Sequence, residues 1–169
     1  MSVAVVVGNP KPESRTLNAA TVLTRELTGA DPDLVVDVVT LGPSLLGWGD
    51  DGVKAAVAAV AASDLVIVAS PTYKGSITGV LKCFLDQVSA GAWKGVTAVP
   101  LMLGGGPVHS LAPEYALVPV LTELGASVPT RGLYLLDSVW EDPAAYRPWL
   151  DAWADTVRTS ASITKGVVA

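Results

Sequence analysis

The chain has 169 residues, of which 50% are hydrophobic and 16% are charged, and its formal net charge is −5. This length is typical of one domain, and the apolar content is enough for a hydrophobic core, which excludes a disordered chain. The basic residues form no run, so the positive surface that nucleic-acid binding needs is absent. The single cysteine, Cys83, and the single histidine, His109, exclude an internal disulfide and a metal site built from several Cys or His ligands.

The N-terminal sequence indicates the cellular location. Residues Met1–Gly8 carry no basic region and are too short an apolar run for a signal peptide. No apolar stretch reaches the length of about 18–20 residues that a membrane helix needs. We therefore expect a cytoplasmic protein that does not associate with a membrane.

Ten elements are predicted in chain order, from apolar periodicity and from proline and glycine positions. They are strand Val3–Val7, helix Leu17–Thr28, strand Leu34–Leu41, helix Gly52–Ala62, strand Leu65–Ala69, helix Gly79–Val88, strand Val96–Leu103, helix Leu111–Leu124, strand Gly132–Leu136 and a helix from Pro148. Strands that alternate with helices indicate βαβ units and a parallel sheet in an α/β fold. We expect one domain over residues 3–160 and a mobile tail over 161–169.

In an open parallel sheet, ligands bind beyond the carboxyl ends of the strands, so the loops after the first, third and fourth strands are candidates. The first loop, from Gly8 to Thr16, runs directly into a helix, whose N-terminal N–H groups suit a phosphate. Ser14 and Thr16 add hydroxyl donors, and Arg15 adds a bidentate cation. An ordinary polar loop with Ser14 as the helix cap is the alternative.

The second loop runs from Ser70 to Gly79 and contains the sequence Pro71-Thr72-Tyr73-Lys74-Gly75-Ser76. It is longer than most loops of compact domains, and its backbone N–H groups could meet a flat polar heterocycle. A long turn with a capping hydroxyl is the alternative. The third loop contains Gly104-Gly105-Gly106, which would let the backbone approach a ligand closely, and His109, which is either a ligand contact or a solvated side chain.

These residues together resemble a known family. The first loop, the Pro71–Ser76 loop, the Gly79–Asp86 segment and the stretch from Gly104 through Tyr115 to Leu121 are similar to the NAD(P)H-dependent FMN reductases. The similarity covers roughly residues 3–135 and is greatest to the FMN reductases of two-component alkanesulfonate monooxygenase systems. Two positions depart from the pattern: Asn9 stands where relatives often have Ser, and Ile77 where an aromatic residue is common.

The resemblance implies a flavodoxin-like three-layer sandwich, with a five-stranded parallel sheet of order 2-1-3-4-5 and helices on both faces. It implies that FMN and NAD(P)H bind and that hydride passes from NAD(P)H to flavin N5, with no catalytic side chain. The implied flavin-binding residues are Asn9, Lys11, Ser14, Arg15, Thr16, Pro71, Thr72, Tyr73, Lys74, Gly75, Ser76, Gly104, Gly105, Gly106 and His109. It also implies a homodimer or homotetramer and a flavin-dependent monooxygenase as partner.

Tyr115 suggests a further local feature. Pro119, four residues later, has no N–H to donate to the Tyr115 carbonyl, so an i→i+5 bond from Val120 would make a π-turn. The resemblance implies a π-helix at this tyrosine, facing another subunit. A proline kink with a buried tyrosine is the alternative.

Three other functions remain open. The first is an FMN-containing quinone, azo-dye or chromate reductase, whose loops would look the same. The second is a flavodoxin-like electron carrier, against which the Arg15 loop and the Pro71–Ser76 loop argue. The third is a flavin-free structural relative.

Overall fold

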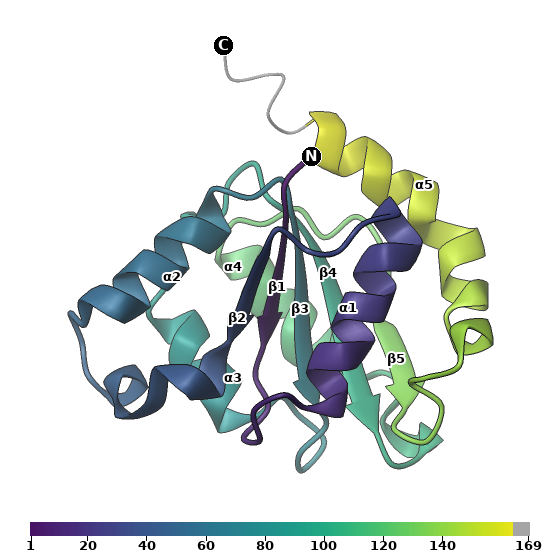
Figure 1. Ribbon diagram of the computed structural model, residues 1–169, viewed down its shortest axis with the longest axis horizontal. Coiled ribbons are helices and arrows are strands. Elements are labelled where there is room, and N and C mark those ends of the chain that lie inside the picture. The colour runs from purple at the N-terminus through teal and green to yellow at the C-terminus, as the bar shows by residue number, and fades with distance from the viewer. Residues whose placement is uncertain (164–169) are drawn as a thin grey trace.

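The computed structural model describes residues 1–163, which form a three-layer α/β sandwich (Figure 1). Its elements are β1 (Val3–Val7), α1 (Arg15–Thr28), β2 (Leu34–Asp37), α2 (Asp51–Ala61), β3 (Leu65–Pro71), α3 (Gly79–Asp86), β4 (Thr97–Gly104), α4 (Val118–Glu123), β5 (Leu133–Leu136) and α5 (Arg147–Ile163). The strands form one parallel sheet in the order β2-β1-β3-β4-β5, as predicted.

The sheet separates two hydrophobic cores. Along β1 the side chains alternate: Val3, Val5 and Val7 pack toward α1 and α5, whereas Ala4 and Val6 pack toward α2, α3 and α4. All five residues of β1 are buried, which explains the continuous apolar run in the sequence. Each layer of helices therefore covers one face of the sheet and leaves the carboxyl edge of the strands open (Figure 1).

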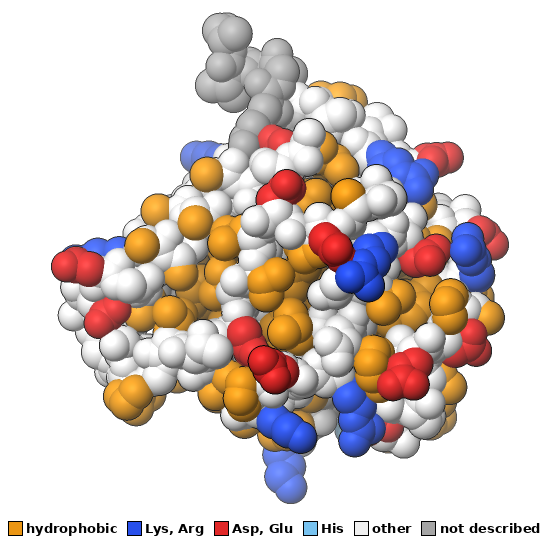
Figure 2. All heavy atoms as spheres, viewed as in Figure 1, with side chains coloured by type: hydrophobic (Ala, Val, Ile, Leu, Met, Phe, Trp, Pro, Cys, Tyr) orange, Lys and Arg blue, Asp and Glu red, His pale blue; other side chains and the backbone are white. Residues whose placement is uncertain are grey.

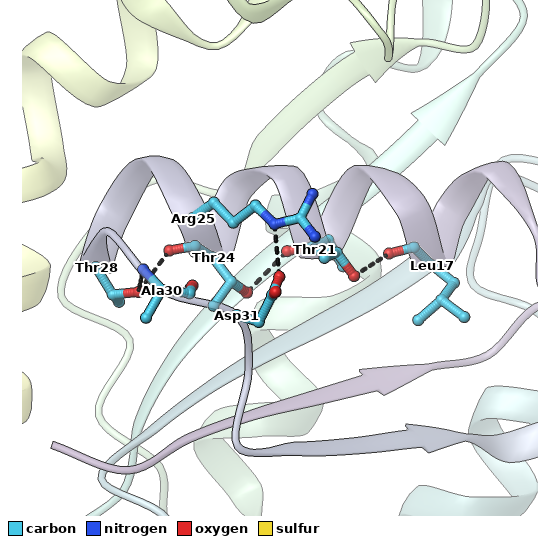
Figure 3. A network of polar contacts seen from close by, with 8 residues as sticks. Leu17, Thr21, Thr24, Arg25, Thr28, Ala30 and Asp31 are labelled. Carbon is cyan, nitrogen blue, oxygen red and sulfur yellow. Dashed lines mark hydrogen bonds and ion pairs between the residues drawn. The ribbon is translucent and has the colours of Figure 1, made fainter.

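Helix α1 is defined by strong signals at both ends. Ser14 caps its N-terminus by accepting a bond from the Leu17 N–H, and Gly29, with φ 77°, ends it in the left-handed conformation. The hydroxyls of three threonines on the helix donate hydrogen bonds to the carbonyls four residues earlier, and Arg25 forms an ion pair with Asp31 after the helix (Figure 3). The contacts that hold the C-terminal end of α1 thus involve no residue of the loop at its N-terminal end.

Strand β2 is shorter than expected. The predicted strand Leu34–Leu41 ends at Asp37, and a 3-10 segment, Val38–Leu46, interrupted at Gly42, follows it. The reason is pairing: β2 lies at the sheet edge, and its only partner, β1, ends at the pair Val7–Asp37. Beyond this pair no strand can continue the hydrogen-bond ladder.

The helix predicted over Leu111–Leu124 is divided in two. A π-helical turn covers Pro113–Leu117, in which the Val118 N–H donates to the Pro113 carbonyl, and α4 follows it. The predicted π-turn is therefore present, but it begins two residues earlier than Tyr115. Tyr115 lies within it and is 56% exposed, which excludes the alternative of a buried tyrosine.

Helix α5 is longer than expected. It begins one residue before Pro148, which falls in the first turn where proline is tolerated, and extends to Ile163. Ala161 is buried in the helix, so the expected tail begins too early by at least three residues. Residues 164–169 of that expected tail lie outside the described residues. Between residues 1 and 163, no helix is both long and apolar enough to cross a bilayer.

Candidate functional site

A groove of about 370 Å³ lies at the carboxyl edge of the sheet. It is bounded by the N-terminus of α1, the segment after β3, and the ends of β4 and β5. In Figure 1 this edge is at the bottom of the molecule, and in Figure 2 Lys and Arg side chains project from the same edge. The groove thus joins the loops that the sequence singled out.

The loop after β1, residues 9–14, has an internal brace. The Asn9 side chain accepts from the Lys11 N–H at 2.9 Å and donates to Thr16 Oγ1 at 3.0 Å. Because Ser14 Oγ and Thr16 Oγ1 both accept a bond within the protein, their O–H groups are left to donate outward. The first turn of α1 supplies backbone N–H groups beside them, and Arg15 and Lys11 add two exposed cations.

The tip of the loop after β3 is a tight two-residue turn. Tyr73 and Ser76 exchange both backbone hydrogen bonds, at 2.9 and 3.0 Å, and Lys74 and Gly75 have φ of 54° and 76°. Positive φ at both central positions identifies a type I′ turn. The N–H groups of Tyr73 and Ser76 are therefore used internally, as is that of Thr72, which donates to the Leu103 carbonyl. This leaves the N–H groups of Lys74 and Gly75 for a ligand, fewer than the sequence suggested.

Thr72 and Tyr134 meet beneath the glycine-rich loop. Tyr134, on β5, donates from its hydroxyl to the Gly106 carbonyl at 2.6 Å. A Cβ on Gly104 would lie 2.1 Å from that hydroxyl and 3.3 Å from Thr72 Oγ1, so Gly104 is required by Tyr134 itself. Thr72 Oγ1 is buried beside the Tyr134 hydroxyl and makes no well-formed hydrogen bond among residues 1–163. It is therefore a polar atom at the groove wall with hydrogen-bonding capacity left for a ligand.

His109 and Tyr115 hold the tip of the same turn from the other side. The Tyr115 hydroxyl donates to the Gly75 carbonyl at 2.6 Å. A Cβ on Gly75 would lie 3.8 Å from His109 Cε1, so the imidazole also borders the turn. The π-helical turn is thus connected to the loop after β3, a link that the sequence did not indicate.

The structure brings most of the candidate residues to the groove. Those that line it are Asn9, Lys11, Ser14, Arg15, Thr16, Pro71, Thr72, Tyr73 and Gly104. Those that do not line it are Lys74, Gly75, Ser76, Gly105, Gly106 and His109, although all six belong to the two loops beside it.

Four lining residues were missed by the sequence reasoning: Glu13, Asn18, Leu103 and Asp137. Asp137 immediately follows β5, and its carbonyl accepts from Arg15 at 3.4 Å. The loop after the fifth strand could have been included by the same rule that selected the others, since all five strands are parallel.

The remaining reactive groups lie elsewhere. Cys83 is half-buried on α3 and faces an apolar groove with Val80 and Leu46. In the part of the chain that the structure describes, no three His, Cys, Asp or Glu side chains are grouped to hold a metal ion.

Comparison with known proteins agrees with this geometry. The family model described as NADPH-dependent FMN reductase matches residues 1–141. The chain is 31% identical over 142 residues to "FMN reductase (NADPH)" of Escherichia coli, a match that covers 82% of this chain and 74% of that protein. It is 27% identical to "NADH-dependent FMN reductase SfnF" of Pseudomonas fluorescens, over 84% of this chain and 80% of the relative.

A solved structure is similar as well. The apo form of NADH:FMN oxidoreductase (EMOB) superimposes with a TM-score of 0.82 and 33% identity, and covers 94% of this chain and 89% of that one. The family match spans all three loops at the groove and the parallel sheet that carries them. The chain therefore belongs to the NADPH-dependent FMN reductase family and has its flavodoxin-like fold.

Proposed function

We propose that the groove is the FMN site of an NAD(P)H-dependent FMN reductase, with the flavin phosphate at the N-terminus of α1 and the ring between the loops after β3 and β4. One observation carries the proposal: a single groove connects the N-terminus of α1 to the loop after β3 and to the end of β4. The family assignment supports it, because the family model covers every residue that lines the groove.

The phosphate end has a suitable set of donors. Ser14 and Thr16 each accept one bond and keep a hydroxyl hydrogen to donate, and the first turn of α1 contributes N–H groups and the positive end of its dipole. Lys11 and Arg15 are exposed and can close over an anion from two sides. Glu13 and Asp137 also line the groove, so the cations there are balanced locally and the site depends on directed donors rather than on net positive charge.

The ring end offers polar groups without an acid or a nucleophile. Thr72 Oγ1 lies at the groove wall with hydrogen-bonding capacity left, and the N–H groups of Lys74 and Gly75 lie on the adjoining type I′ turn. When FMN is bound, its isoalloxazine supplies the redox chemistry by accepting hydride from NAD(P)H at N5. The protein's own contribution is to orient the ring, to donate hydrogen bonds to its polar edge and to leave one face open to the nicotinamide.

We further propose that FMN is exchanged as a substrate and that its reduced form passes to a flavin-dependent monooxygenase. The exposed phosphate-end side chains Lys11, Glu13 and Arg15 are consistent with exchange, because nothing covers that end of the groove among the described residues. A flavodoxin-like electron carrier or a quinone reductase would share the fold. These alternatives differ in whether NAD(P)H is oxidised and whether added FMN is needed.

We also propose a homodimer or homotetramer. Leu46 and Trp48 are about four-fifths exposed beside an apolar groove on α3, and a second groove on the same helix is bordered by Pro119 and Val120 of α4. Large apolar side chains around one outward helix are typical of a surface that associates.

The test is a comparison of two arginine variants by steady-state oxidation of NADPH and NADH with varied FMN. Arg15→Ala removes a charge-assisted contact to the phosphate and is expected to raise the KM for FMN roughly 10-fold or more, with kcat nearly unchanged. Arg25→Ala, at the other end of α1, is the matched control and should leave both constants unchanged, since its partner is Asp31. Equal effects of the two variants, or none, would place the phosphate elsewhere.

A further inference from the structure

Asp37, the last residue of β2, reaches into the loop between β1 and α1. Its Oδ2 accepts the Glu13 N–H at 3.0 Å, across 24 positions of sequence. Glu13 has φ 50°, a left-handed conformation that residues other than glycine rarely adopt. The contact therefore holds the loop at the residue whose backbone conformation is least favourable.

The other fixed points of residues 9–14 are local. Asn9 ties Lys11 and Thr16, and Ser14 caps the helix that follows it. Among the described residues, Asp37 is the one side chain from another element that bonds to the backbone of residues 9–14, whereas Thr78 bonds to the preceding Gly8 carbonyl. It connects the loop to the sheet, which is the rigid part of the molecule.

This carboxyl group is poorly placed for stability alone. Its Oδ1 is buried and has no partner among residues 1–163. Burial, as the main cause, raises the pKa of Asp37; the charge of Glu13 adds to this, and the hydrogen bond from Glu13 opposes it. A carboxyl group placed where the fold disfavours its charge, and bonded to the strained position of this loop, points to a role beyond stability.

We propose that Asp37 is a positioning residue for flavin phosphate binding: by holding Glu13 in its turn, it aligns Ser14, Arg15 and Thr16 toward the anion. The proposal rests on the proposed function, since it needs the phosphate at the start of α1. Asp37 does not line the groove and acts through the loop. Its negative charge opposes an anion nearby, so its benefit comes from accepting the hydrogen bond.

Two substitutions separate the acceptor from the charge. Asp37→Ala removes both, whereas Asp37→Asn removes the charge and keeps a carbonyl oxygen that can accept from the Glu13 N–H. Asp33→Ala is a matched control: Asp33 lies just before the same strand and accepts a backbone N–H, that of Val3, at 2.7 Å at the opposite edge of the sheet. Asp37→Val, which suits a strand end, replaces Asp37→Ala if that variant does not fold.

The measurement is the dissociation constant of FMN and of riboflavin, which lacks the phosphate, by quenching of flavin fluorescence, together with kcat and KM for FMN. Asp37→Ala is expected to weaken FMN binding about 10-fold and riboflavin binding less than about twofold, with kcat retained at saturating FMN. Asp37→Asn should bind FMN within about threefold of the wild type. Asp33→Ala should leave the ratio of the two constants unchanged.

Four results would overturn the assignment. An Asp37→Ala protein that binds FMN like the wild type shows that the loop does not need the contact. Equal weakening for FMN and riboflavin shows that Asp37 supports the fold generally, and an Asn variant as weak as the Ala variant shows that the charge matters rather than the acceptor. A wild-type protein that binds riboflavin as tightly as FMN contradicts the phosphate site itself, and therefore both the proposed function and the role of Asp37. A preference for FMN that is present in the wild type and unchanged in Asp37→Ala contradicts the role of Asp37 alone.

Discussion

Single side chains determine the shape of the groove more than the glycine-rich loop itself does. The sequence singles out Gly104 as a position where a ligand could approach the backbone, yet the atom nearest to a Cβ built on it is the hydroxyl of Tyr134. Tyr134 thus selects glycine at position 104 and ties down Gly106 at the same time. No pattern in the sequence indicates this role, because Tyr134 lies inside a strand and its partners Gly104 and Gly106 lie about 30 positions earlier, beyond the reach of local periodicity.

Removal of the Tyr134 hydroxyl should loosen this loop without unfolding the protein. We expect Tyr134→Phe to raise the KM for FMN and for riboflavin alike, by about three- to tenfold, since the loop borders the ring and one hydrogen bond is lost. Tyr146→Phe is the matched control, because its hydroxyl bonds to the Trp140 carbonyl and neither residue lines the groove. Steady-state kinetics with both flavins check this, and unchanged constants in Tyr134→Phe would mean that Gly106 needs no anchor.

At the scale of elements, α3 and the loop after β1 pack unusually closely. A Cβ on Gly8 would lie 2.1 Å from the Leu81 Cβ, and Thr78, the cap of α3, donates to the Gly8 carbonyl. Gly8→Ala should therefore push α3 away from β1 and lower the free energy of unfolding by about 1–3 kcal/mol. Chemical denaturation is the measurement.

Gly105→Ala provides the contrast for stability. Nothing lies within 4 Å of a Cβ built on Gly105, so the free energy of unfolding should be within about 0.5 kcal/mol of the wild type. If the two alanine variants unfold at the same denaturant concentration, the close packing of Gly8 on Leu81 does not contribute to the free energy of unfolding as expected.

Prediction from sequence was most accurate where an element is determined by its own residues. Strand β1 has the predicted bounds, because a run of buried β-branched residues needs little context. The predicted end of β2 and the predicted start of the π-turn were wrong by a few residues. The structure places them at Asp37 and Pro113. The first depends on where the partner strand β1 ends, and the second on the Val118 N–H, which reaches the Pro113 carbonyl two residues before the predicted Tyr115 acceptor.

In the candidate site, too, local features could be predicted from the sequence and contacts between distant segments could not. The three loops and their common edge followed from alternating strands and helices, because parallel strands place their carboxyl ends together. The contacts between loops did not: Tyr115 to Gly75, Arg15 to Asp137 and Asp37 to Glu13 each join segments that are far apart in sequence. Single-sequence periodicity carries no information about such pairs.

At the scale of the whole molecule, the core beneath α5 gives the protein a defined response to alkaline pH. Tyr146 is fully buried, and burial raises its pKa above the ordinary value of 10.0. Because the unfolded chain releases this proton near pH 10 and the folded chain holds it to higher pH, the stability that Tyr146 contributes is complete below pH 10 and is lost as the pH rises above it.

Comparison with Tyr146→Phe isolates this effect. At neutral pH the variant should be less stable by about 1 kcal/mol, since it lacks the hydrogen bond to Trp140. As the pH rises above 10, the wild type should lose stability faster than the variant, and the difference should narrow or reverse. Denaturation curves measured across this range test it, and parallel pH profiles would contradict the buried neutral tyrosine.

The carboxyl edge of the sheet, the groove and the family assignment support the proposal that a flavin is held between α1 and two loops so that NAD(P)H can reduce it. The most direct measurement is the loss of nicotinamide absorbance when the purified protein is mixed with NADPH or NADH, with and without added FMN. The account predicts oxidation that depends on added FMN and saturates with it. Flavin binding without nicotinamide oxidation, or oxidation that requires a quinone or dye in place of FMN, would contradict it.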